Sequence, residues 1–159
     1  MPTIKRILCP VDFSETAAVA AREAAALARA AGAELLLVHV LSEPWLATSG
    51  EGGYPAPIVQ QYEMIARCKL DRAADALAWL TKVRTQLAYG TVEEAISQAA
   101  SKQDAGLIVM GARSRKGLSR LLGDGMTERV MKRARVPVVR VCPSPRKPPL
   151  HVATPHGHA

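Results

Sequence analysis

The sequence predicts a doubly wound α/β fold: an open, parallel sheet of five strands with helices on both faces. Two observations carry this prediction. Short apolar runs alternate with longer segments whose alanines and leucines recur at helical spacing. Aromatic residues make up only 4 % of the 159 residues, so small side chains must let helices pack closely on the sheet. The length fits one domain.

The first three elements have clear signals at their ends. Residues 4–11 form a short apolar run interrupted by a proline, which predicts a strand buried on both faces. A helix over residues 15–31 follows, with Ser14 as its N-cap and Gly32 as its C-terminal stop. Residues 34–41 are again apolar, and they form the second predicted strand.

The next segment changes character. Residues 42–57 contain three prolines and three glycines, so we expect an irregular excursion. A helix over residues 58–80 follows, and residues 82–89 alternate as a half-exposed edge strand does. The apolar face expected for this helix consists of Met64, Cys68, Leu70, Ala74, Leu77 and Ala78.

The last elements place function on one edge of the sheet. Thr91 and Glu94 form a capping box, in which Thr91 caps the amide of Glu94 and the helix runs to residue 102. The remaining elements are a strand over residues 105–110, a helix over residues 126–135 and a strand over residues 137–141. Because ligands of such sheets lie beyond the carboxyl ends of the strands, we expect function on the loops after the first, second and fourth strands.

Composition predicts where the domain ends in the sequence and in which compartment the protein is located. Residues 1–142 form the single predicted domain, and the Pro- and His-rich residues 143–159 are expected to be a disordered tail. The start of the chain lacks the apolar core of a secretory signal, and no stretch is apolar enough to span a membrane, which predicts a cytoplasmic protein. Three cysteines without metal-ligand spacing are interpreted as packing thiols.

The positive charge is concentrated near the C-terminus. Residues 1–110 carry ten basic and twelve acidic residues, a charge of −2, whereas residues 111–159 carry eleven and two, a charge of +9. Such an excess indicates an anionic partner or merely a soluble basic tail. Nucleic acid is disfavoured, because no aromatic residues alternate with the basic ones for base stacking.

The loop over residues 111–125 has the composition of a phosphate site. A glycine ends the preceding strand, and basic residues and further glycines follow before a helix begins. Glycine allows close approach of the backbone to an anion, while free amides and the helix dipole attract it. The loop contains neither the Gly-Lys-Ser/Thr triplet of a P-loop nor a G-x-G-x-x-G motif.

Three motifs in order resemble the universal stress protein family across almost all of residues 3–142. Residues 7–14 (ILCPVDFS) resemble its first strand and Asp-containing turn, and residues 37–40 (LVHV) its second strand. Residues 109–141 are similar to its signature of Gly, two residues, Gly, nine residues, Gly and then Ser or Thr. The resemblance implies the strand order 3-2-1-4-5, which places the first strand beside the fourth.

The resemblance also implies a ligand and its contacts. A stress-response regulatory protein of this type binds ATP or another adenine nucleotide, with or without Mg²⁺, and does not turn it over rapidly. The adenine pocket would be lined by Pro10, Val11, Asp12 and the backbone of Val40. The phosphates would be held by Gly111, Arg113, Ser114, Gly125, Met126 and Thr127. A homodimer would form by antiparallel pairing of the last strand, Val136 to Cys142, whose exposed edge would otherwise be a liability.

Two departures from the signature leave alternatives open. Ser114 stands where the second glycine belongs, and the count of nine then reaches Asp124 and Gly125 instead of Gly-Ser. A carboxylate at position 124 would repel a triphosphate and, as an N-cap, would occupy amides that phosphates need. The alternative is therefore a dimeric interaction protein that binds no nucleotide. A slow hydrolase with Asp12 as the base is a third possibility.

Two single residues have a structural as well as a functional interpretation. Asp12 either caps the first helix, contacts the ligand, or does both. His39 lies within a strand and has no second potential metal ligand near it in the sequence, so it is expected to be a satisfied interior histidine rather than a catalytic base.

Overall fold

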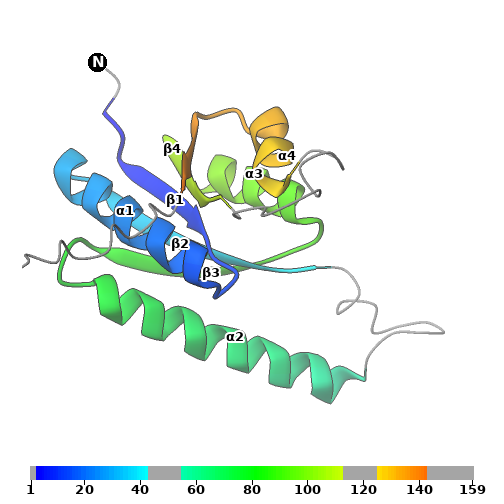
Figure 1. Cartoon of the computed structure of the whole chain (residues 1–159). Helices are drawn as coiled ribbons and strands as arrows, with labels where there is room; N and C mark the ends of the chain where they lie inside the picture. The colour runs from blue at the N-terminus through cyan, green and yellow to red at the C-terminus, as the bar shows by residue number, and fades with distance from the viewer. Residues whose placement is uncertain (1–2, 43–54, 113–124, 143–159) are drawn as a thin grey trace, which may run out of the picture.

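The computed structural model describes residues 3–42, 55–112 and 125–142 and contains a five-stranded parallel sheet in the order β3-β2-β1-β4-β5 (Figure 1). The strands are β1 (Arg6–Pro10), β2 (Glu34–Leu41), β3 (Val83–Tyr89), β4 (Leu107–Gly111) and β5 (Val138–Val141). The helices are α1 (Glu15–Ala31), α2 (Ala56–Leu77), α3 (Val92–Lys102) and α4 (Met126–Arg133). The predicted fold class and strand order are confirmed.

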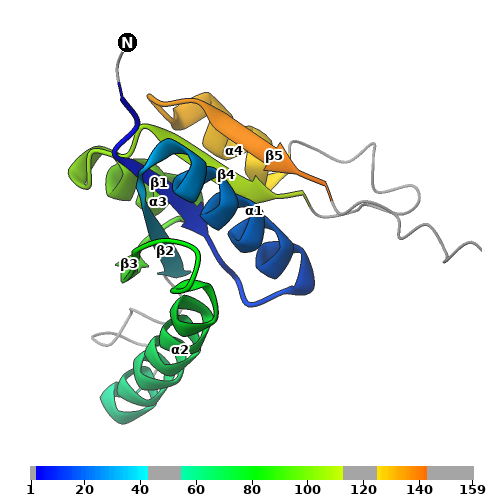
Figure 2. The ribbon, with the colours of Figure 1, turned by 90° about the vertical axis from the view of Figure 1, so that its left-hand side faces the viewer.

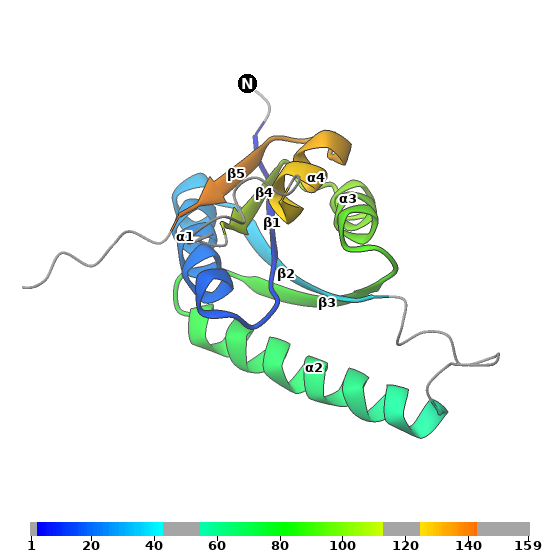
Figure 3. The same cartoon turned by 45° about the vertical axis from the view of Figure 1, so that its right-hand side comes forward.

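The helices divide into two layers, one on each face of the sheet. In Figure 3, α1 and α2 lie on one side of the strands, and α3 and α4 lie on the other. Alternate residues of β2 follow this division: Leu35 and Leu37 pack toward α1 and α2, whereas Leu36 and Val38 pack toward α3 and α4. Six buried alanines on α1 allow this helix to lie close to the strands (Figure 2).

The first helix begins and ends where the sequence predicts. The Ser14 hydroxyl accepts a hydrogen bond from the Ala17 amide at 3.2 Å, which satisfies one of the free donors of the first turn. At the other end Gly32 has φ 64°, the left-handed conformation that glycine adopts without strain. The predicted bounds of both α1 and β2 are confirmed.

The second helix differs from its prediction. It begins at Ala56 after the N-cap Pro55 and ends at Leu77, three residues before the expected end, while residues 43–54 lie outside the described residues. Leu70 and Leu77 are buried as expected, but the Met64 side chain is 61 % exposed and Cys68 is exposed. The amino-terminal end of α2 reaches past the end of β2, so this part of the helix has less sheet to cover (Figure 3).

The capping hydrogen bond predicted for α3 is also wrong. Thr91 occupies the N-cap, but its hydroxyl donates to the Glu94 carboxylate at 3.1 Å instead of accepting from the Glu94 amide. A charged acceptor forms the stronger bond, so it takes the hydroxyl proton. The last helix ends two residues early, because Ala134 already has an extended backbone (ψ 139°). The predicted tail over residues 143–159 lies outside the described residues.

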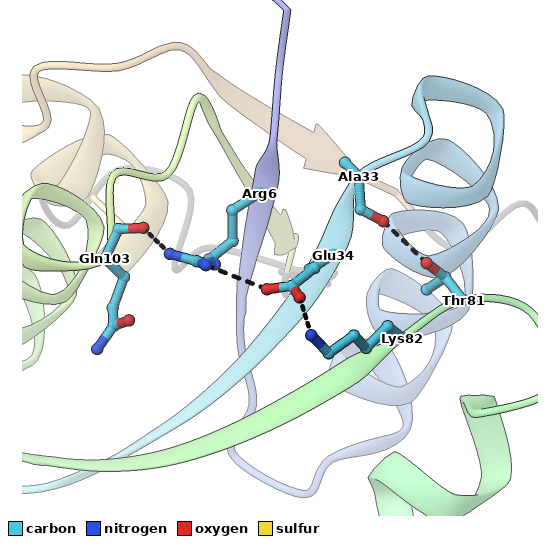
Figure 4. A network of polar contacts seen from close by, with 6 residues as sticks. All are labelled: Arg6, Ala33, Glu34, Thr81, Lys82 and Gln103. Carbon is cyan, nitrogen blue, oxygen red and sulfur yellow. Dashed lines mark hydrogen bonds and ion pairs between the residues drawn. The ribbon is translucent and has the colours of Figure 1, made fainter.

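Charged side chains connect the amino ends of three strands. The Glu34 carboxylate on β2 accepts from Arg6 of β1 at 3.1 Å and pairs with Lys82, which precedes β3 (Figure 4). The Arg6 guanidinium also donates to the carbonyl of Gln103, beyond α3. We call Arg6, Glu34, Lys82 and Gln103 the amino-edge cluster. Their bonds hold the amino ends of the strands together, at the edge opposite the one where a ligand is expected.

Candidate nucleotide site

The candidate site lies at the carboxyl edge, which we define as the ends of β1, β2 and β4 and the residues that follow them. Pro10 pairs with Val38 at the end of β1, and Gly111 pairs with Val141 at the end of β4. Because β1 lies between β2 and β4, the predicted residues at these three strand ends share one edge of the sheet. This is the edge at which doubly wound sheets bind ligands.

The backbone of Val40 faces the space beyond β1. Successive residues of a strand direct their N–H and C=O groups to opposite neighbours. The Glu34 amide bonds to β1 and the Leu35 amide bonds toward β3, so even-numbered residues of β2 face β1. The last backbone bond across this pair runs from the Val11 amide to the Val38 carbonyl at 2.8 Å. Val40 therefore presents a donor and an acceptor where β1 has already ended.

Asp12 organises the turn that leads into α1. Its Oδ1 accepts from the Ser14 amide at 3.0 Å and from the Ser14 hydroxyl, and the Asp12 side chain is exposed. Ser14, and not Asp12, is the N-cap, so the interpretation of Asp12 as the cap is wrong. Asp12 instead orients Ser14, the residue that caps the helix. Asp12 itself lies at the carboxyl edge.

Gly111 is required by packing. A Cβ at this position would lie 2.7 Å from the carbonyl oxygen of Thr16 and 3.0 Å from its carbonyl carbon, both in the first turns of α1. The contact with the carbonyl oxygen is shorter than real Cβ atoms make, and the neighbour is backbone that cannot rotate away. The glycine that ends β4 thus allows α1 to approach the sheet, whatever its role toward an anion.

The amino terminus of α4 is the predicted anion site. Gly125 is the N-cap, and among the described residues no side chain bonds to the first-turn amides. Met126 is half-buried and Thr127 is buried, so the first turn is anchored to the rest of the domain. The predicted conflict at Asp124 lies outside the described residues, but Gly125 and not Asp124 holds the N-cap position.

One charged residue of this terminus was missed. Glu128 lies in the first turn of α4, where it would oppose a phosphate, and it pairs with Arg140 of β5 at 2.8 Å. The ion pair neutralises the carboxylate that faces the helix dipole. The sequence contains a signal for Glu128, since acidic residues are common in first turns, but the partner twelve positions away depends on the fold.

A pocket of about 310 Å³ lies next to this edge, between the end of β2 and α2. Of its residues only Val40 belonged to the predicted site. The lining consists of Phe13, His39, Val40, Leu41, Ser42, Tyr62, Ile65, Ala66 and Lys69. The α2 residues could not be assigned from sequence, because the pattern of residues 42–57 gives no signal for how the following helix lies against β2.

His39 is a satisfied histidine, as expected. Its ring is half-buried, and Nδ1 lies 2.8 Å from the carbonyl oxygen of Val11. The carbonyl only accepts, so Nδ1 carries the proton. The ring of Phe13 lies against it, with the centroids 4.4 Å apart.

The cysteines divide into two kinds. Cys9 is buried in the core between the sheet and α1, and burial raises the pKa of its thiol to about 12. Cys68 and Cys142 are exposed, so their interpretation as packing thiols is wrong.

Neither a metal centre nor a membrane span is found in the part of the chain that the structure describes. No three His, Cys, Asp or Glu residues among residues 3–42, 55–112 and 125–142 are grouped to hold a metal ion. Within the same ranges, no helix combines the length and the apolar character that crossing a membrane requires.

Of the predicted contacts, Pro10, Val11, Asp12, Val40 and Gly111 lie at the carboxyl edge. Gly125, Met126 and Thr127 lie at the amino terminus of α4. The remaining two, Arg113 and Ser114, lie outside the described residues.

Sequence relatives agree on one family. Residues 3–141 match the model of the universal stress protein family. The chain is 31 % identical over 146 residues to universal stress protein MJ0531 of Methanocaldococcus jannaschii, covering 90 % of this chain and 84 % of the relative. It is 34 % identical over 137 residues to a universal stress protein of Thermus aquaticus, covering 86 % and 98 %.

Solved structures agree on the fold. A universal stress protein family member from Burkholderia pseudomallei superposes with a TM-score of 0.70 at 28 % identity, covering 89 % of this chain and 98 % of that one. A universal stress protein in complex with cAMP has a TM-score of 0.70 at 19 % identity, covering 88 % and 98 %. One from Archaeoglobus fulgidus in complex with dAMP has a TM-score of 0.60 at 24 % identity, covering 88 % and 98 %. With its sheet order, its carboxyl edge and these relatives, the chain belongs to the universal stress protein family.

Proposed function

We propose that the chain binds an adenine nucleotide at the carboxyl edge and acts as a regulatory binding protein that does not turn the nucleotide over rapidly. The observation that carries the proposal is the outward-facing N–H and C=O of Val40, beyond the last backbone bond to β1. Adenine offers an acceptor, N1, beside a donor, the 6-amino group, which complements one N–H and one C=O. Pro10, Val11 and Asp12 border the same position.

The phosphates of the nucleotide are assigned to the other half of the carboxyl edge. The first turn of α4, which no side chain of the described residues caps, offers amides and the positive end of a helix dipole. We include Arg113 and Ser114 in this half of the proposed site from the sequence alone. The cAMP and dAMP complexes of other proteins with this fold agree in ligand class with the proposal.

Calorimetric titration tests the proposal directly. ATP, ADP and AMP are titrated with and without Mg²⁺, and GTP serves as the base control. We expect binding of all three adenine nucleotides, with GTP weaker by about tenfold, the value of roughly one well-placed hydrogen bond. No heat at millimolar adenine nucleotide would overturn the proposal. Steady phosphate release from ATP that Asp12→Ala abolishes would instead show that the protein is a hydrolase.

A second candidate is a dimeric interaction protein that binds no nucleotide. Two observations favour it: Glu128 carries a carboxylate in the first turn of α4, and the outer strand β5 leaves Val139 41 % exposed. We propose that β5 pairs with its copy in a homodimer under either candidate, which removes the open edge. The substitution Val139→Asp should then give a monomer in sedimentation, and an unchanged dimer would refute the arrangement. A dimer without any nucleotide heat would select the second candidate.

We also propose a cytoplasmic location. Cys9, Cys68 and Cys142 are all free thiols, and two of them are exposed. Exposed free thiols persist in a reducing compartment, whereas oxidising compartments pair or modify them.

A further inference from the structure

The His39 ring occupies a hydrogen-bond position that normally belongs to the sheet. In a parallel pair the ladder continues by alternation, so the bond from the Val11 amide to the Val38 carbonyl would ordinarily be followed by one from the Val40 amide to the Val11 carbonyl. In this structure the Val11 carbonyl is instead 2.8 Å from Nδ1 of His39. The described residues include no backbone hydrogen bond between Val40 and Val11.

The neighbours of the ring hold it in this position. Phe13 lies against it with the centroids 4.4 Å apart and the planes tilted by 33°. Phe13 itself has φ 63°, a conformation that costs a bulky residue energy and therefore must be held by its surroundings. The Lys69 ammonium of α2 lies 5.3 Å from the Phe13 ring centroid, on the helix that lines the same pocket. The ring is thus fixed between a carbonyl and an aromatic face.

From this geometry we propose that His39 is a positioning residue for nucleotide binding. By donating to the Val11 carbonyl, the ring ends the β1–β2 ladder one bond early and keeps the Val40 amide free for the base. Without the ring donor, the Val11 carbonyl would accept from the Val40 amide, and this amide would no longer be available to the base. The affinity consequence rests on the proposed function, whereas the effect on the Val40 amide does not.

Three variants of His39 distinguish the effect of the hydrogen-bond donor from the effect of the shape of the ring. In His39→Asn the side-chain amide nitrogen lies at the same number of bonds from Cβ as Nδ1, so it can donate to Val11. In His39→Gln the nitrogen lies one bond further out, and in His39→Leu there is no donor. We expect ATP and adenosine affinities within about threefold of the unmodified chain for Asn, and about tenfold lower for Leu and Gln. Equal losses for ATP and adenosine would place the effect at the base.

Amide hydrogen exchange of Val40 tests the proposal without any ligand. We expect fast exchange of this amide in the unmodified chain and in His39→Asn, and slower exchange in His39→Leu, where the ladder bond closes. Thermal unfolding of each variant controls for general destabilisation, which would speed exchange instead. A protected Val40 amide in the unmodified chain, or the same exchange rate in His39→Leu, would overturn the proposal. If no nucleotide binds the unmodified chain, the proposed function fails, and the exchange result still decides the role of His39.

Discussion

The amino edge and the carboxyl edge of the sheet differ in whether their polar groups are paired. At the amino edge the polar side chains bind one another: Arg6, Glu34 and Lys82 connect three strands, and Nε of Arg6 is the one buried side-chain atom of these three residues without a partner in the described residues. At the carboxyl edge Asp12 binds Ser14, but the backbone groups of Val40 have no partner on β1, and among the described residues no side chain caps the first turn of α4. The polar groups of the amino edge are otherwise already paired, so they need no ligand. The unpaired backbone groups of the carboxyl edge are solvated by water in the free protein, so leaving them unpaired costs little free energy, and they can bind a ligand.

The difference has a physical origin in how a parallel sheet ends. The ladder stops wherever one strand leaves the sheet, and the neighbour then keeps unpaired backbone groups. At the amino edge, charged side chains connect the strands to one another and, through Arg6, to the Gln103 carbonyl beyond α3. At the carboxyl edge β1 ends before β2 does, so the backbone groups of Val40 have no partner on β1. Substitutions that fill, cap or neutralise positions at each edge therefore test whether one edge serves stability and the other binding.

The largest expected effect is that of Gly111→Ala on stability. The new Cβ would lie 2.7 Å from the Thr16 carbonyl oxygen, so α1 must move away from β4. Overpacking against backbone costs about 1–3 kcal/mol of unfolding free energy. Urea denaturation followed by circular dichroism measures it. This result would show that one position at the carboxyl edge serves the fold as well as any ligand.

Gly106→Ala is the matched control for this prediction. Its Cβ would meet the Ile4 side chain at 3.3 Å, and a side chain can shift where backbone cannot. We expect a loss below about 1 kcal/mol, since surface-near changes of this kind are usually small. Equal losses for the two variants would mean that the contact with Thr16 does not decide the role of Gly111.

The second prediction is that Gly125→Ser separates stability from binding. Gly125 has φ −64° and ψ 167°, which suits a serine N-cap, and among the described residues a Cβ there would meet the end of the flexible Glu128 side chain. The hydroxyl would take one first-turn amide, so unfolding free energy should stay within about 0.5 kcal/mol while ATP affinity falls about tenfold. Calorimetry with adenosine as the comparison ligand checks this, because adenosine lacks phosphates. An equal loss for adenosine would argue against a phosphate site at α4.

The third prediction concerns the charge in the same turn. Glu128→Gln removes a carboxylate near the proposed phosphates and releases Arg140, which it pairs at 2.8 Å. We expect ATP affinity to rise about two- to fivefold at low salt and the gain to shrink in 0.5 M salt, roughly as the Debye length falls. The control Arg140→Gln should lower affinity, because it leaves the Glu128 carboxylate without its cation. A gain independent of salt would exclude an electrostatic cause.

Local signals predicted some parts of this molecule and not others. Ser14 and Gly32 mark the bounds of α1, because capping depends on neighbours in sequence. The exposed Met64 was assigned to a buried face, because the extent of the sheet beneath α2 is set by distant strands. Likewise, the outward-facing Val40 backbone was implied by family resemblance, but its cause, the bond between His39 and Val11, depends on two strands meeting.

The smallest expected effect belongs to the amino edge and to pH. Hydrogen bonds from Lys82 and Arg6 lower the pKa of Glu34 below its usual 4.5. A carboxyl whose pKa is lower in the folded state stabilises the fold above its unfolded pKa, and this contribution is lost as the pH falls through the folded pKa. Glu34→Gln should therefore be less stable than the unmodified chain at pH 7, and the difference should shrink below pH 4.5.

The same variant sharpens the contrast between the edges, because no contact joins the amino-edge cluster to the described residues of the proposed site. Denaturation by urea at pH 7 and pH 3 measures the stability difference, and titration with ATP at pH 7 measures binding. We expect a small change in stability that depends on pH, since ion pairs that solvent reaches contribute little, and unchanged affinity. A stability difference that persists at pH 3 would point to lost packing rather than lost charge. Weakened ATP binding would mean that the strands transmit strain from one edge to the other, and the separation of a structural edge from a binding edge would then fail.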